Sequence, residues 1–437
     1  MVFGFGKGKK RPPVPDDEDE QIELVLFQGA TNGKDANLSA NARLVQAGLV
    51  RTKELISDAL SRRAEMIKLE PKGKVSLATF YVDGIPYPGS RMPPQAGLAV
   101  TQMVKLLAGL EIKVRNKPQV GGINTEYDGT PYLLRVNVNP VQGGNERLIV
   151  RAENKNLNLA TPDDLGFSPQ MRERIREMAA SKTGVLLAAG PPMSGVTTMA
   201  FAMVRGVDPY LYTVYNMTDI EGRDLGHVTT FEGNPGDTWE QSVGRAKRAE
   251  ADVIYVDPIR KASFCKQVFE EAEDVCIVSE VPAHDAASAI VQIREWLEDP
   301  KLTAKRLHGV IGQKLIRLLC RKCRQAYRPN PKLLARVGLP PETNVLYRHP
   351  PPPAEGQPDV EPCRKCGGTG YYGRTGLTEF IEMTDGMKKV VASGGDAAAI
   401  KAQARKEKMQ TLNSDGMRLV AAGKTSLEEL QRAFKAK

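Results

Sequence analysis

The sequence predicts an α/β fold built on a parallel sheet, because short apolar runs alternate with helical patterns after Thr161. The candidate buried strands are Val185–Ala189, Leu211–Tyr215, Val253–Val256 and Val275–Ser279. The candidate helices between and after them are Thr238–Glu250, Ala262–Glu271 and Asp285–Trp296. The first strand also meets a glycine-rich turn that opens another helix at about Thr197. Strands without polar alternation are typical of parallel sheets that helices cover on both faces.

Length and composition bound the class of protein. The chain has 437 residues, with 61 Lys and Arg against 52 Asp and Glu, a net charge of +9 and 41% hydrophobic residues. This length implies two to four domains, and the composition excludes a mostly disordered or fibrous chain. No apolar run approaches the ~18 residues of a membrane span, and Met1–Glu20 lacks the apolar core of a signal peptide. We therefore expect a cytoplasmic protein without a membrane span.

The first 160 residues predict a tail followed by a small α+β domain. Residues 1–40 are expected to form a disordered tail and linker, because the first 20 residues consist of a basic run and an acidic run separated by prolines. Residues 41–160 mix helices and strands, which is typical of one α+β domain. Its predicted elements are a helix from an N-cap at Thr52, a strand at Val75–Tyr81, a helix through Leu98 and Leu107, and strands at Leu133–Val138 and Leu148–Arg151.

The rest of the chain divides into three expected parts. Residues 161–318 form the α/β domain, residues 319–381 a module rich in proline and cysteine pairs, and residues 382–437 a helical domain. The expected core of the helical domain consists of Leu412, Met417, Leu419, Leu427, Leu430 and Phe434.

Residues 190–198 have the frame of a P-loop, G-x-x-x-x-G-K-[ST], between a strand and a helix. In such a loop, backbone N–H groups wrap the phosphates, the lysine reaches them and the hydroxyl holds Mg²⁺. The lysine position is occupied by Val196, and Met193 stands where glycine is usual. These residues leave open a tight turn that binds nothing or weak ATP and Mg²⁺ binding through the backbone. The candidate nucleotide-binding residues are Gly190, Ser194, Gly195, Thr197 and Thr198.

Two C-x₂-C pairs predict a metal site. Cys320 with Cys323 and Cys363 with Cys366 each put two thiolates on one tight turn, and four sulfurs suit tetrahedral Zn²⁺. Closed four-sulfur coordination leaves no open position, so we expect a structural zinc rather than a catalytic one. The alternative is four free thiols. Cys265 and Cys276 are isolated, and we interpret them as buried inert thiols.

Several motifs together resemble the ATPases of type II secretion and type IV pilus assembly, the secretion-system protein E family. The most specific match is CRKCGGTGYYGRTG, residues 363–376. The other matching segments are Ala64–Pro71, Arg135–Val136, Arg151, Asp285–Ala289, Gly312–Leu315 with Cys320 and Cys323, and Glu379.

The resemblance implies an architecture and a setting. The 161–318 domain would be a RecA-like P-loop NTPase core, followed by a zinc module and a C-terminal helical bundle. Members assemble as rings with nucleotide between subunits, so Arg135 and Arg151 would serve a neighbouring subunit's nucleotide and Arg248 would occupy a further family arginine position. Implied partners are further copies or an active paralogue, and an inner-membrane platform protein. The implied location is the cytoplasm, peripheral to the inner membrane.

The departures from the family pattern fall on its chemistry. Val196 replaces the P-loop lysine, Pro258 the catalytic glutamate and Pro282 a histidine, while Tyr215–Met217 replaces an acidic box. Removing one charge-placing group costs on the order of 10²–10³ in rate. We therefore expect a catalytically impaired, ATPase-like motor subunit with a structural or regulatory role.

Two alternatives stay open at this point. The first is a working ATPase with relocated groups, in which Asp257 holds Mg²⁺ and Lys261 or Lys182 approaches the phosphates. The second is a zinc-knuckle nucleic-acid binder. An aromatic content of 6% without basic-aromatic interleaving argues against this second alternative, so no nucleic-acid partner is expected.

The net charge is concentrated in one stretch. Residues 301–330 hold nine basic residues and no acidic one, which equals the whole charge surplus of +9. The pattern is compatible with a solvated helix face or with a surface for an acidic partner or a neighbouring subunit.

Overall fold

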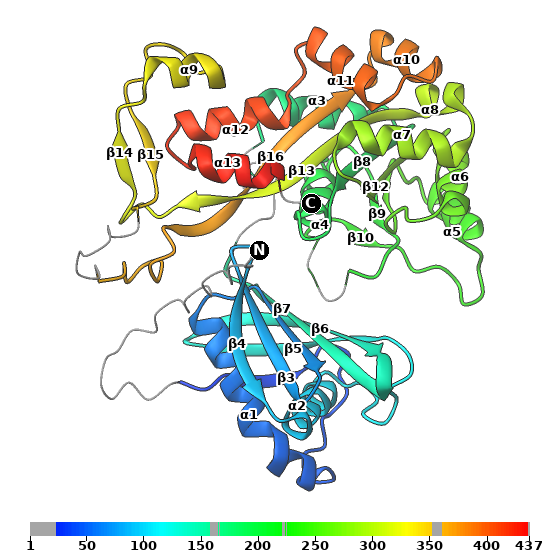
Figure 1. Ribbon diagram of the computed structural model, residues 1–437. Helices are drawn as coiled ribbons and strands as arrows, with labels where there is room; N and C mark the ends of the chain where they lie inside the picture. Colours follow the sequence, from blue (N-terminus) through cyan, green and yellow to red (C-terminus); the bar gives the residue numbers. More distant parts are fainter. Residues whose placement is uncertain are drawn as a thin grey trace, which may run out of the picture. The chain divides into compact units, whose positions relative to one another are not determined.

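The computed structural model describes residues 23–157, 165, 167–220, 223, 225–351 and 361–435. Contacts divide the chain into two compact units (Figure 1). The first comprises residues 1–158 with the segments Cys320–Cys323 and Pro351–Tyr372, and the second comprises residues 159–319, 324–350 and 373–437. Of the predicted tail and linker at residues 1–40, residues 1–22 lie outside the described part of the chain.

The first unit is a seven-stranded antiparallel sheet in the order β1-β5-β6-β7-β2-β3-β4, with two helices packed on it. Its elements are β1 Leu26–Ala30, α1 Ala42–Ser61, β2 Met66–Lys72, β3 Val75–Val82, β4 Ile85–Met92, α2 Pro94–Leu107, β5 Gln119–Tyr127, β6 Thr130–Val141, the short 3₁₀ helix Gln142–Gly144 and β7 Asn145–Asn154. The predicted α+β mixture is thus present, with helix α2 and strands β3, β6 and β7 where the sequence placed them.

Burial alternates along the strands of this sheet, as expected for one covered and one open face. In β3, Ala78, Phe80 and Val82 are buried and join the core that α1 and α2 close, while the residues between them are partly exposed. Gly97 of α2 lies so close to Ser76 that a side-chain carbon there would sit 2.4 Å from its Cβ. Small residues at this contact let the helix approach the sheet closely.

Two boundaries of the first unit correct the sequence-based expectation. Strand β1 lies inside residues 1–40, which had been assigned to a tail and linker, and pairs with β5. Helix α1 begins at Ala42, ten residues before the predicted N-cap Thr52, which is buried within the helix. The first turns of α1 already carry apolar residues at helical spacing, Leu44, Val45 and Leu49, which pack against the core and which the sequence-based boundary overlooked.

The second unit is built on a seven-stranded sheet in the order β10-β9-β11-β12-β8-β13-β16, in which β16 is Tyr371–Glu382. The first six strands in this order, β10, β9, β11, β12, β8 and β13, pair in parallel. This confirms the predicted α/β class. The elements up to β12 are α3 Pro169–Ala180, β8 Val185–Gly190, α4 Val196–Arg205, β9 Val214–Asn216, β10 Thr229–Thr230, α5 Trp239–Arg248, β11 Val253–Tyr255, α6 Ala262–Glu271 and β12 Cys276–Pro282. Next come α7 Ala286–Leu297, α8 Pro300–Arg306 and β13 Leu307–Leu319.

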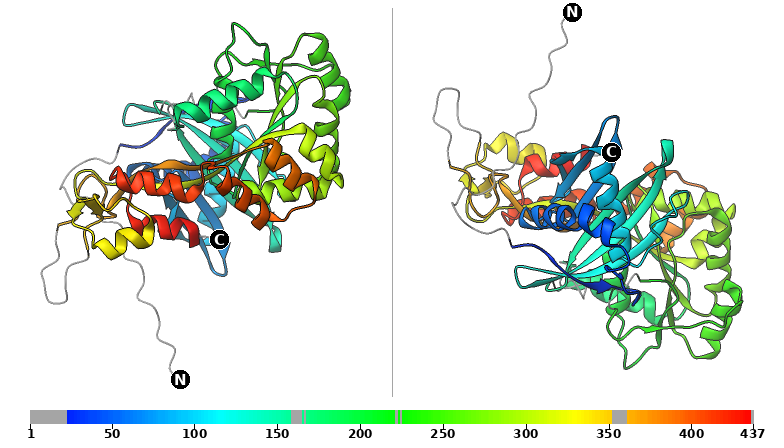
Figure 2. Two further views of the ribbon diagram at one scale, coloured as in Figure 1. Left: turned by 90° about the horizontal axis from the view of Figure 1, so that it is seen from above. Right: turned by 90° about the horizontal axis from the view of Figure 1, so that it is seen from below.

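Helices cover both faces of this sheet, as Figures 1 and 2 show. One apolar cluster joins the sheet to α5, α6 and α7, and a second joins it to α3 and α4. All six residues of β8 are buried, which accounts for the absence of polar alternation in its sequence. The chain therefore leaves β8 at the carboxyl-terminal end of the parallel strands, between the two helix-covered faces of the sheet.

The basic stretch 301–330 is not one helix face: Lys301, Lys305 and Arg306 lie on helix α8, and the stretch then continues as a strand. Strand β13 occupies Leu307–Leu319, and Lys314 within it is only 6% exposed. Arg317 donates to the buried carboxylate of Glu429 at 2.7 Å. These two positive charges are therefore satisfied inside the molecule, while Lys301, Lys305, Arg321, Lys322 and Arg328 of the same stretch are exposed.

The last elements are β14 Gln325–Tyr327, α9 Pro331–Val337, β15 Leu346–Arg348, β16 Tyr371–Glu382, α10 Asp385–Ala392, α11 Ala397–Lys406, α12 Leu412–Ala421 and α13 Leu427–Lys435. Strand β16 belongs to the large sheet, and β14, α9 and β15 pack with α12 and α13. Residues 319–381 are therefore not one contiguous module: apolar side chains such as Leu334 and Leu346 draw its middle part into the helical core.

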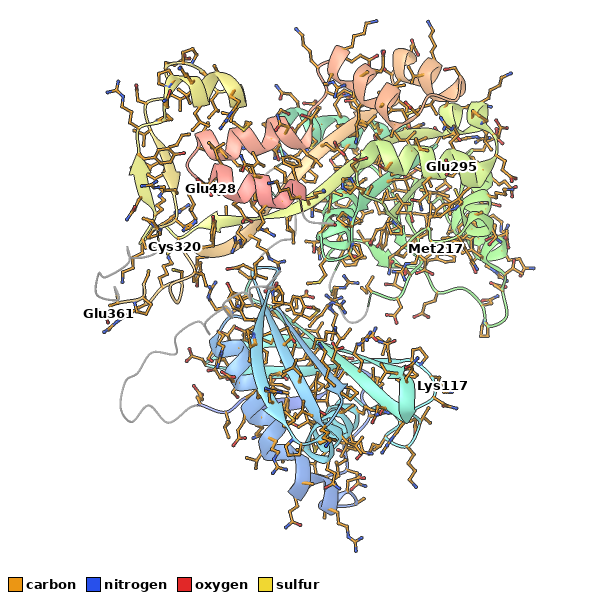
Figure 3. All side chains as sticks on the ribbon, viewed as in Figure 1. Lys117, Met217, Glu295, Cys320, Glu361 and Glu428 are labelled. Carbon is orange, nitrogen blue, oxygen red and sulfur yellow. The ribbon has the colours of Figure 1, made fainter. Side chains whose placement is uncertain are left out.

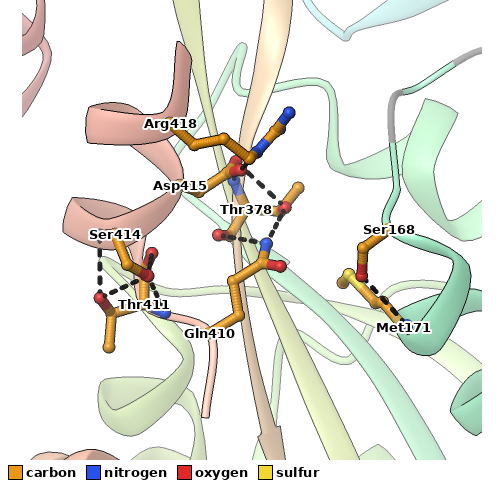
Figure 4. Close-up of polar contacts among 8 residues, drawn as sticks. All are labelled: Ser168, Met171, Thr378, Gln410, Thr411, Ser414, Asp415 and Arg418. Carbon is orange, nitrogen blue, oxygen red and sulfur yellow. Dashed lines mark hydrogen bonds and ion pairs between the residues drawn. The ribbon is translucent and has the colours of Figure 1, made fainter. Parts of the chain in front are cut away.

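Figure 4 shows how the C-terminal helices are fastened to β16. Asp415 of α12 accepts from the backbone N–H of Thr378 at 3.0 Å and from Arg418 at 2.7 Å, and Gln410 donates to Thr378. Leu412, Leu419, Leu427 and Leu430 form the core expected from the sequence, with Met417 at its margin. Phe434 is 38% exposed, so the expectation that it completes this core is wrong.

Among the residues that the structure describes, no helix is both long and apolar enough to cross a bilayer.

Candidate functional site

The P-loop frame is located where the sequence predicted it, at the carboxyl end of β8. Helix α4 begins at Val196 with Gly195 as its N-cap, and the Ser194 N–H bonds to the Pro191 carbonyl at 3.1 Å. Thr197 and Thr198 lie on the first turn of α4. The backbone N–H groups at the start of α4 therefore lie at the carboxyl-terminal end of the parallel strands. Such a helix start favours the binding of anions.

Close packing explains the glycines of the loop. A side-chain carbon on Gly190 would lie 2.4 Å from Ser194 Oγ and 2.5 Å from the Gln313 carbonyl oxygen. Gly195 has φ +79°, in the left-handed region that glycine adopts without strain. Gln313 Nε2 donates to the Ser194 carbonyl at 2.8 Å, so β13 holds the loop from its other side.

Two residues of the loop oppose phosphate binding. Met193 has φ +66°, a strained conformation for a residue with a side chain, and is 41% exposed. Val196 packs on the apolar cluster of α3 and α4 instead of reaching outward as a lysine would. Position 196 thus supplies no charge to the loop.

A carboxylate that sequence reasoning missed lies against the loop. Glu280 of β12, 8% exposed, accepts a hydrogen bond on Oε2 from Thr197 Oγ1 at 2.9 Å and on Oε1 from Tyr255 OH at 2.6 Å. Burial and the adjacent Glu280 raise the pKa of Tyr255, so its hydroxyl stays protonated and donates. An acidic residue near the carboxyl end of a buried strand was the signal available, but the predicted strand stopped at Ser279, one residue short of it.

Asp257 follows β11 and is exposed. Its carboxylate accepts from the hydroxyl of Thr218, and its backbone carbonyl accepts from Ser279 Oγ at 2.7 Å. The neighbouring Pro258 stands where the resembled family has glutamate. Asp257 therefore lies at the same carboxyl-terminal end of the sheet as the P-loop frame, but its carboxylate is bound by Thr218 and not by a residue of the loop.

A charged cluster surrounds the start of α7, beside the end of β8. Asp285, the N-cap of α7, contacts Lys401 Nζ at 2.6 Å and His284 Nδ1 at 3.1 Å. His284 Nε2 lies 3.4 Å from Lys314 Nζ. Burial alone would raise the pKa of Asp285, but Lys401, Ser288 and His284 outweigh it and hold this pKa well below the usual range. The histidine two residues after Pro282 is thereby engaged in this cluster.

Three other charged candidates lie elsewhere or point to solvent. Lys182 pairs with Asp252 at 2.8 Å, at the amino ends of β8 and β11 and thus opposite the loop. Arg248 ends α5 at that same amino edge, so within one chain it is not brought to the loop. Lys261 is exposed at the N-cap of α6. Lys182 consequently cannot replace the missing P-loop lysine.

Arg135 and Arg151 lie in the first unit on β6 and β7. They are direct cross-strand neighbours, and Arg135 Nε is 3.6 Å from the Glu153 carboxylate. Like charges opposite each other on one face of a sheet repel, and Glu153 of the same sheet supplies an anion that offsets this repulsion.

The four cysteines of the two C-x₂-C pairs meet, with their sulfurs within 4.8 Å of one another. Cys323 Sγ and Cys366 Sγ are 3.7 Å apart, close to the ~3.8 Å edge of a tetrahedron with metal–sulfur bonds of about 2.3 Å. Figure 3 labels Cys320, which follows the end of β13. Although burial opposes it, the backbone N–H groups of Cys366 and Lys365 lower the pKa of the Cys363 thiol to about 7. This cluster can hold a metal ion.

The two remaining cysteines match the expectation of buried thiols. Cys265 and Cys276 are fully buried, and burial raises the pKa of each thiol to about 12. Both therefore stay protonated at neutral pH and act as small apolar side chains.

Comparison with known proteins identifies the family. The model of the Type II/IV secretion system protein family matches residues 45–432. The chain belongs to this family. Among its relatives is the type IV pilus assembly ATPase PilB of Thermus thermophilus, 29% identical over 86% of this chain but only 42% of the relative's length. The type II secretion system protein E of Dickeya dadantii is 26% identical over 87% of the chain and 74% of its own length.

Solved structures of similar fold include ATPases of secretion and pilus systems. The Legionella pneumophila ATPase DotB matches with a TM-score of 0.52 and 16% identity, over 88% of this chain and 95% of its own. The pilus retraction motor PilT, solved with bound ADP, matches with a TM-score of 0.51 and 17% identity, over 87% and 96%. These likenesses support the predicted RecA-like ATPase core as a fold.

Proposed function

We propose that this member of the family is a nucleotide-binding but catalytically impaired motor subunit, with a structural or regulatory role in a type II secretion or type IV pilus machine. The observation that carries the proposal is the loop itself. Gly190, Gly195 and Thr197 keep the shape and the hydroxyl of a phosphate cradle, while Val196 packs into the core and leaves it uncharged.

Phosphoryl transfer is catalysed by positioning and by charge placed against the transferring phosphate. The chain lacks the loop lysine at position 196 and the carboxylate at position 258, and His284 is engaged with Asp285 and Lys314. A backbone cradle still attracts an anion without these groups, because its N–H groups need no side-chain charge. Binding therefore survives changes that remove turnover.

One observation favours the second candidate, an ATPase that works with relocated groups. Glu280 puts a carboxylate on Thr197 at 2.9 Å, where an acid of the neighbouring strand can take part in metal binding. It does not replace the charge missing at position 196, since it is itself negative. The impaired subunit is the better supported function.

The setting follows from the family and from surface features of the first unit. The facing Arg135 and Arg151 suit an anion supplied by another subunit, so we propose assembly in a ring with further copies or with an active paralogue. The inner-membrane platform protein of the machine is the proposed docking partner, which places the chain in the cytoplasm beside the membrane. The four-cysteine cluster is proposed to hold a structural Zn²⁺, because four thiolates at tetrahedral spacing are the donors zinc prefers.

The experiment is a comparison of ATP turnover between the purified chain and a Thr197→Val/Asp257→Asn double variant. The proposal predicts equal rates, because neither residue supports a working site. A turnover of about one per minute that the double change abolishes would support the relocated-group ATPase instead, since a rate that depends on these two residues requires a working site.

A further inference from the structure

We propose that Glu280 is the carboxylate that holds the nucleotide's Mg²⁺ at this loop, in the place left by Pro258. The inference rests on the proposed function, because it assumes that the loop binds nucleotide. The inference places the metal-binding acid on β12, whereas the family pattern has its acid after β11, at the position of Pro258.

The position of Glu280 is set by the sheet. Strand β12 lies directly beside β8, and Glu280 is paired in register with Ala188, two residues before the glycine that starts the loop. Its side chain meets the first turn of α4 through the 2.9 Å bond from Thr197. Strand β11, which would carry the family acid, is one strand further from β8. An acid on β12 is therefore closer to the loop's hydroxyl than one on β11.

The direction of the hydrogen bond suits a metal ligand. Thr197 donates its proton to Glu280 Oε2, so the lone pairs of Thr197 Oγ1 point away from the carboxylate and are available to a cation. In P-loop proteins that cation is held by the loop hydroxyl together with an acidic side chain. Hard oxygen donors of this kind are those that Mg²⁺ prefers, and the ion keeps several waters.

A second contact fixes the orientation of the carboxylate. Tyr255 OH donates to Glu280 Oε1 at 2.6 Å, and Tyr255 itself is 2% exposed and packs edge-on against Phe201 of α4. Each carboxylate oxygen thus accepts one protein donor and retains a lone pair for a water of the ion's hydration shell. Tyr255 is a positioning residue in this arrangement.

A buried carboxylate bound by neutral donors also has a physical reason to attract a cation. In the hydrogen bonds described, Glu280 is bound by the two hydroxyls of Thr197 and Tyr255, while the guanidinium of Arg223 lies over the Phe201 ring and acts on Tyr255 through its charge. Burying a charge is costly unless it is paired or coordinates a metal. An ion at the loop would pair this charge and that of the bound phosphates together.

The test is the effect of Mg²⁺ on the affinity for a fluorescent ATP analogue, measured with MgCl₂ and with EDTA. Wild-type protein is expected to bind about tenfold more tightly with Mg²⁺. Glu280→Gln keeps the shape but removes the charge, so it should reduce this gain to within about twofold while leaving the affinity in EDTA unchanged or slightly improved. Glu295→Gln, an exposed change on α7 (Figure 3), removes one negative charge elsewhere and should preserve the gain.

A second variant covers the case in which Glu280→Gln fails to fold. Tyr255→Phe keeps the carboxylate and loses only its orienting donor, so it should lower the Mg²⁺ gain by about threefold. The double variant Thr197→Val/Glu280→Gln should lose no more of the Mg²⁺-dependent gain in affinity than either single variant, because both residues act on one ion. A Glu280→Gln protein with the full Mg²⁺ gain, or a wild type whose affinity ignores Mg²⁺, would overturn the assignment of Glu280. Absence of nucleotide binding in both buffers would instead contradict the proposed function, and the inference with it.

Discussion

Met193 is the residue of the loop whose side chain is least compatible with its backbone conformation. Its φ of +66° costs about 1–2 kcal/mol for a residue with a side chain, whereas glycine in the unfolded chain costs only about 0.5–1 kcal/mol of entropy. Since Met193 is 41% exposed, little burial is lost on its removal. We predict that Met193→Gly raises the free energy of unfolding by about 0.5–1 kcal/mol, measured by urea titration.

The matched control is Met193→Ala, which shortens the side chain but keeps the carbon that causes the strain. It should leave stability nearly unchanged. Equal effects of glycine and alanine would mean that the side chain, not the backbone angle, is responsible.

Asp285 gives the molecule a predictable dependence on acid. Because its folded-state pKa is depressed, its contribution is complete above the unfolded pKa of about 3.9 and is lost as the pH falls below that value. The charged groups that face it are His284, Lys401, Lys314 and Glu379. We predict that Asp285→Asn costs about 1 kcal/mol at pH 6 and clearly less at pH 3, by urea unfolding. A cost independent of pH would show that the carboxylate's charge is not what stabilises this N-cap.

Residue patterns predicted the loop and the cysteine cluster, because both are local spacings read directly from the chain. Glu280 was missed for the opposite reason. Its role depends on Thr197 and Tyr255, which lie on two other elements, and only the folded sheet brings the three side chains together.

At the scale of elements, the buried parallel strands were predictable and the open antiparallel ones less so. The run Val185–Ala189 is uniformly apolar and became β8. Strands β2, β4 and β5 were not predicted, because β4 contains Pro86 and Pro88 and β5 contains Gly121 and Gly122, which weaken a strand pattern. Strand β13 was hidden by its basic residues Lys314 and Arg317, whose contacts, His284 and Glu429, come from distant parts of the sequence.

Strand β13 and helix α13 are joined by a buried ion pair. Glu429 is 1% exposed and accepts from both Arg317, at 2.7 Å, and Arg432, at 2.6 Å. Burial opposes it, but the bonds from Arg432 and Arg317 keep the pKa of Glu429 low. We predict that Arg317→Met lowers the free energy of unfolding by about 3 kcal/mol, because it leaves a buried carboxylate with one partner.

Arg328→Met is the control for this change, since Arg328 belongs to the same basic stretch but is exposed. Its effect should stay within about 0.5 kcal/mol. Similar losses from both variants would argue that the stretch acts through its summed charge and not through the pair with Glu429.

The cysteine cluster makes a prediction about metal content. If four thiolates hold a structural zinc, elemental analysis of the purified chain should find one zinc per chain, and Cys363→Ser should lose it together with part of the thermal stability. Cys265→Ser is the comparison, because that thiol is buried away from the cluster and its change should leave the zinc content intact. Wild-type protein without metal would contradict the site.

At the scale of the whole molecule, the chain belongs to the Type II/IV secretion system protein family, and the proposal of an impaired motor rests on the residues at its loop. The cradle, the facing Arg135 and Arg151 and the cysteine cluster all survive. Val196 and Pro258 remove the charges that act on the transferring phosphate. The proposed function accordingly predicts a subunit that binds nucleotide and hydrolyses little of it.

The most direct test is a single-turnover measurement with γ-labelled ATP and the protein in excess, in the presence of Mg²⁺. Rapid filtration reports how much nucleotide is bound, and acid quenching reports how much of it has been hydrolysed. We predict bound nucleotide that is recovered intact as ATP after about an hour, because binding needs the backbone cradle and turnover needs the missing charges. Bound ATP converted to ADP at about one per minute or faster would contradict the account.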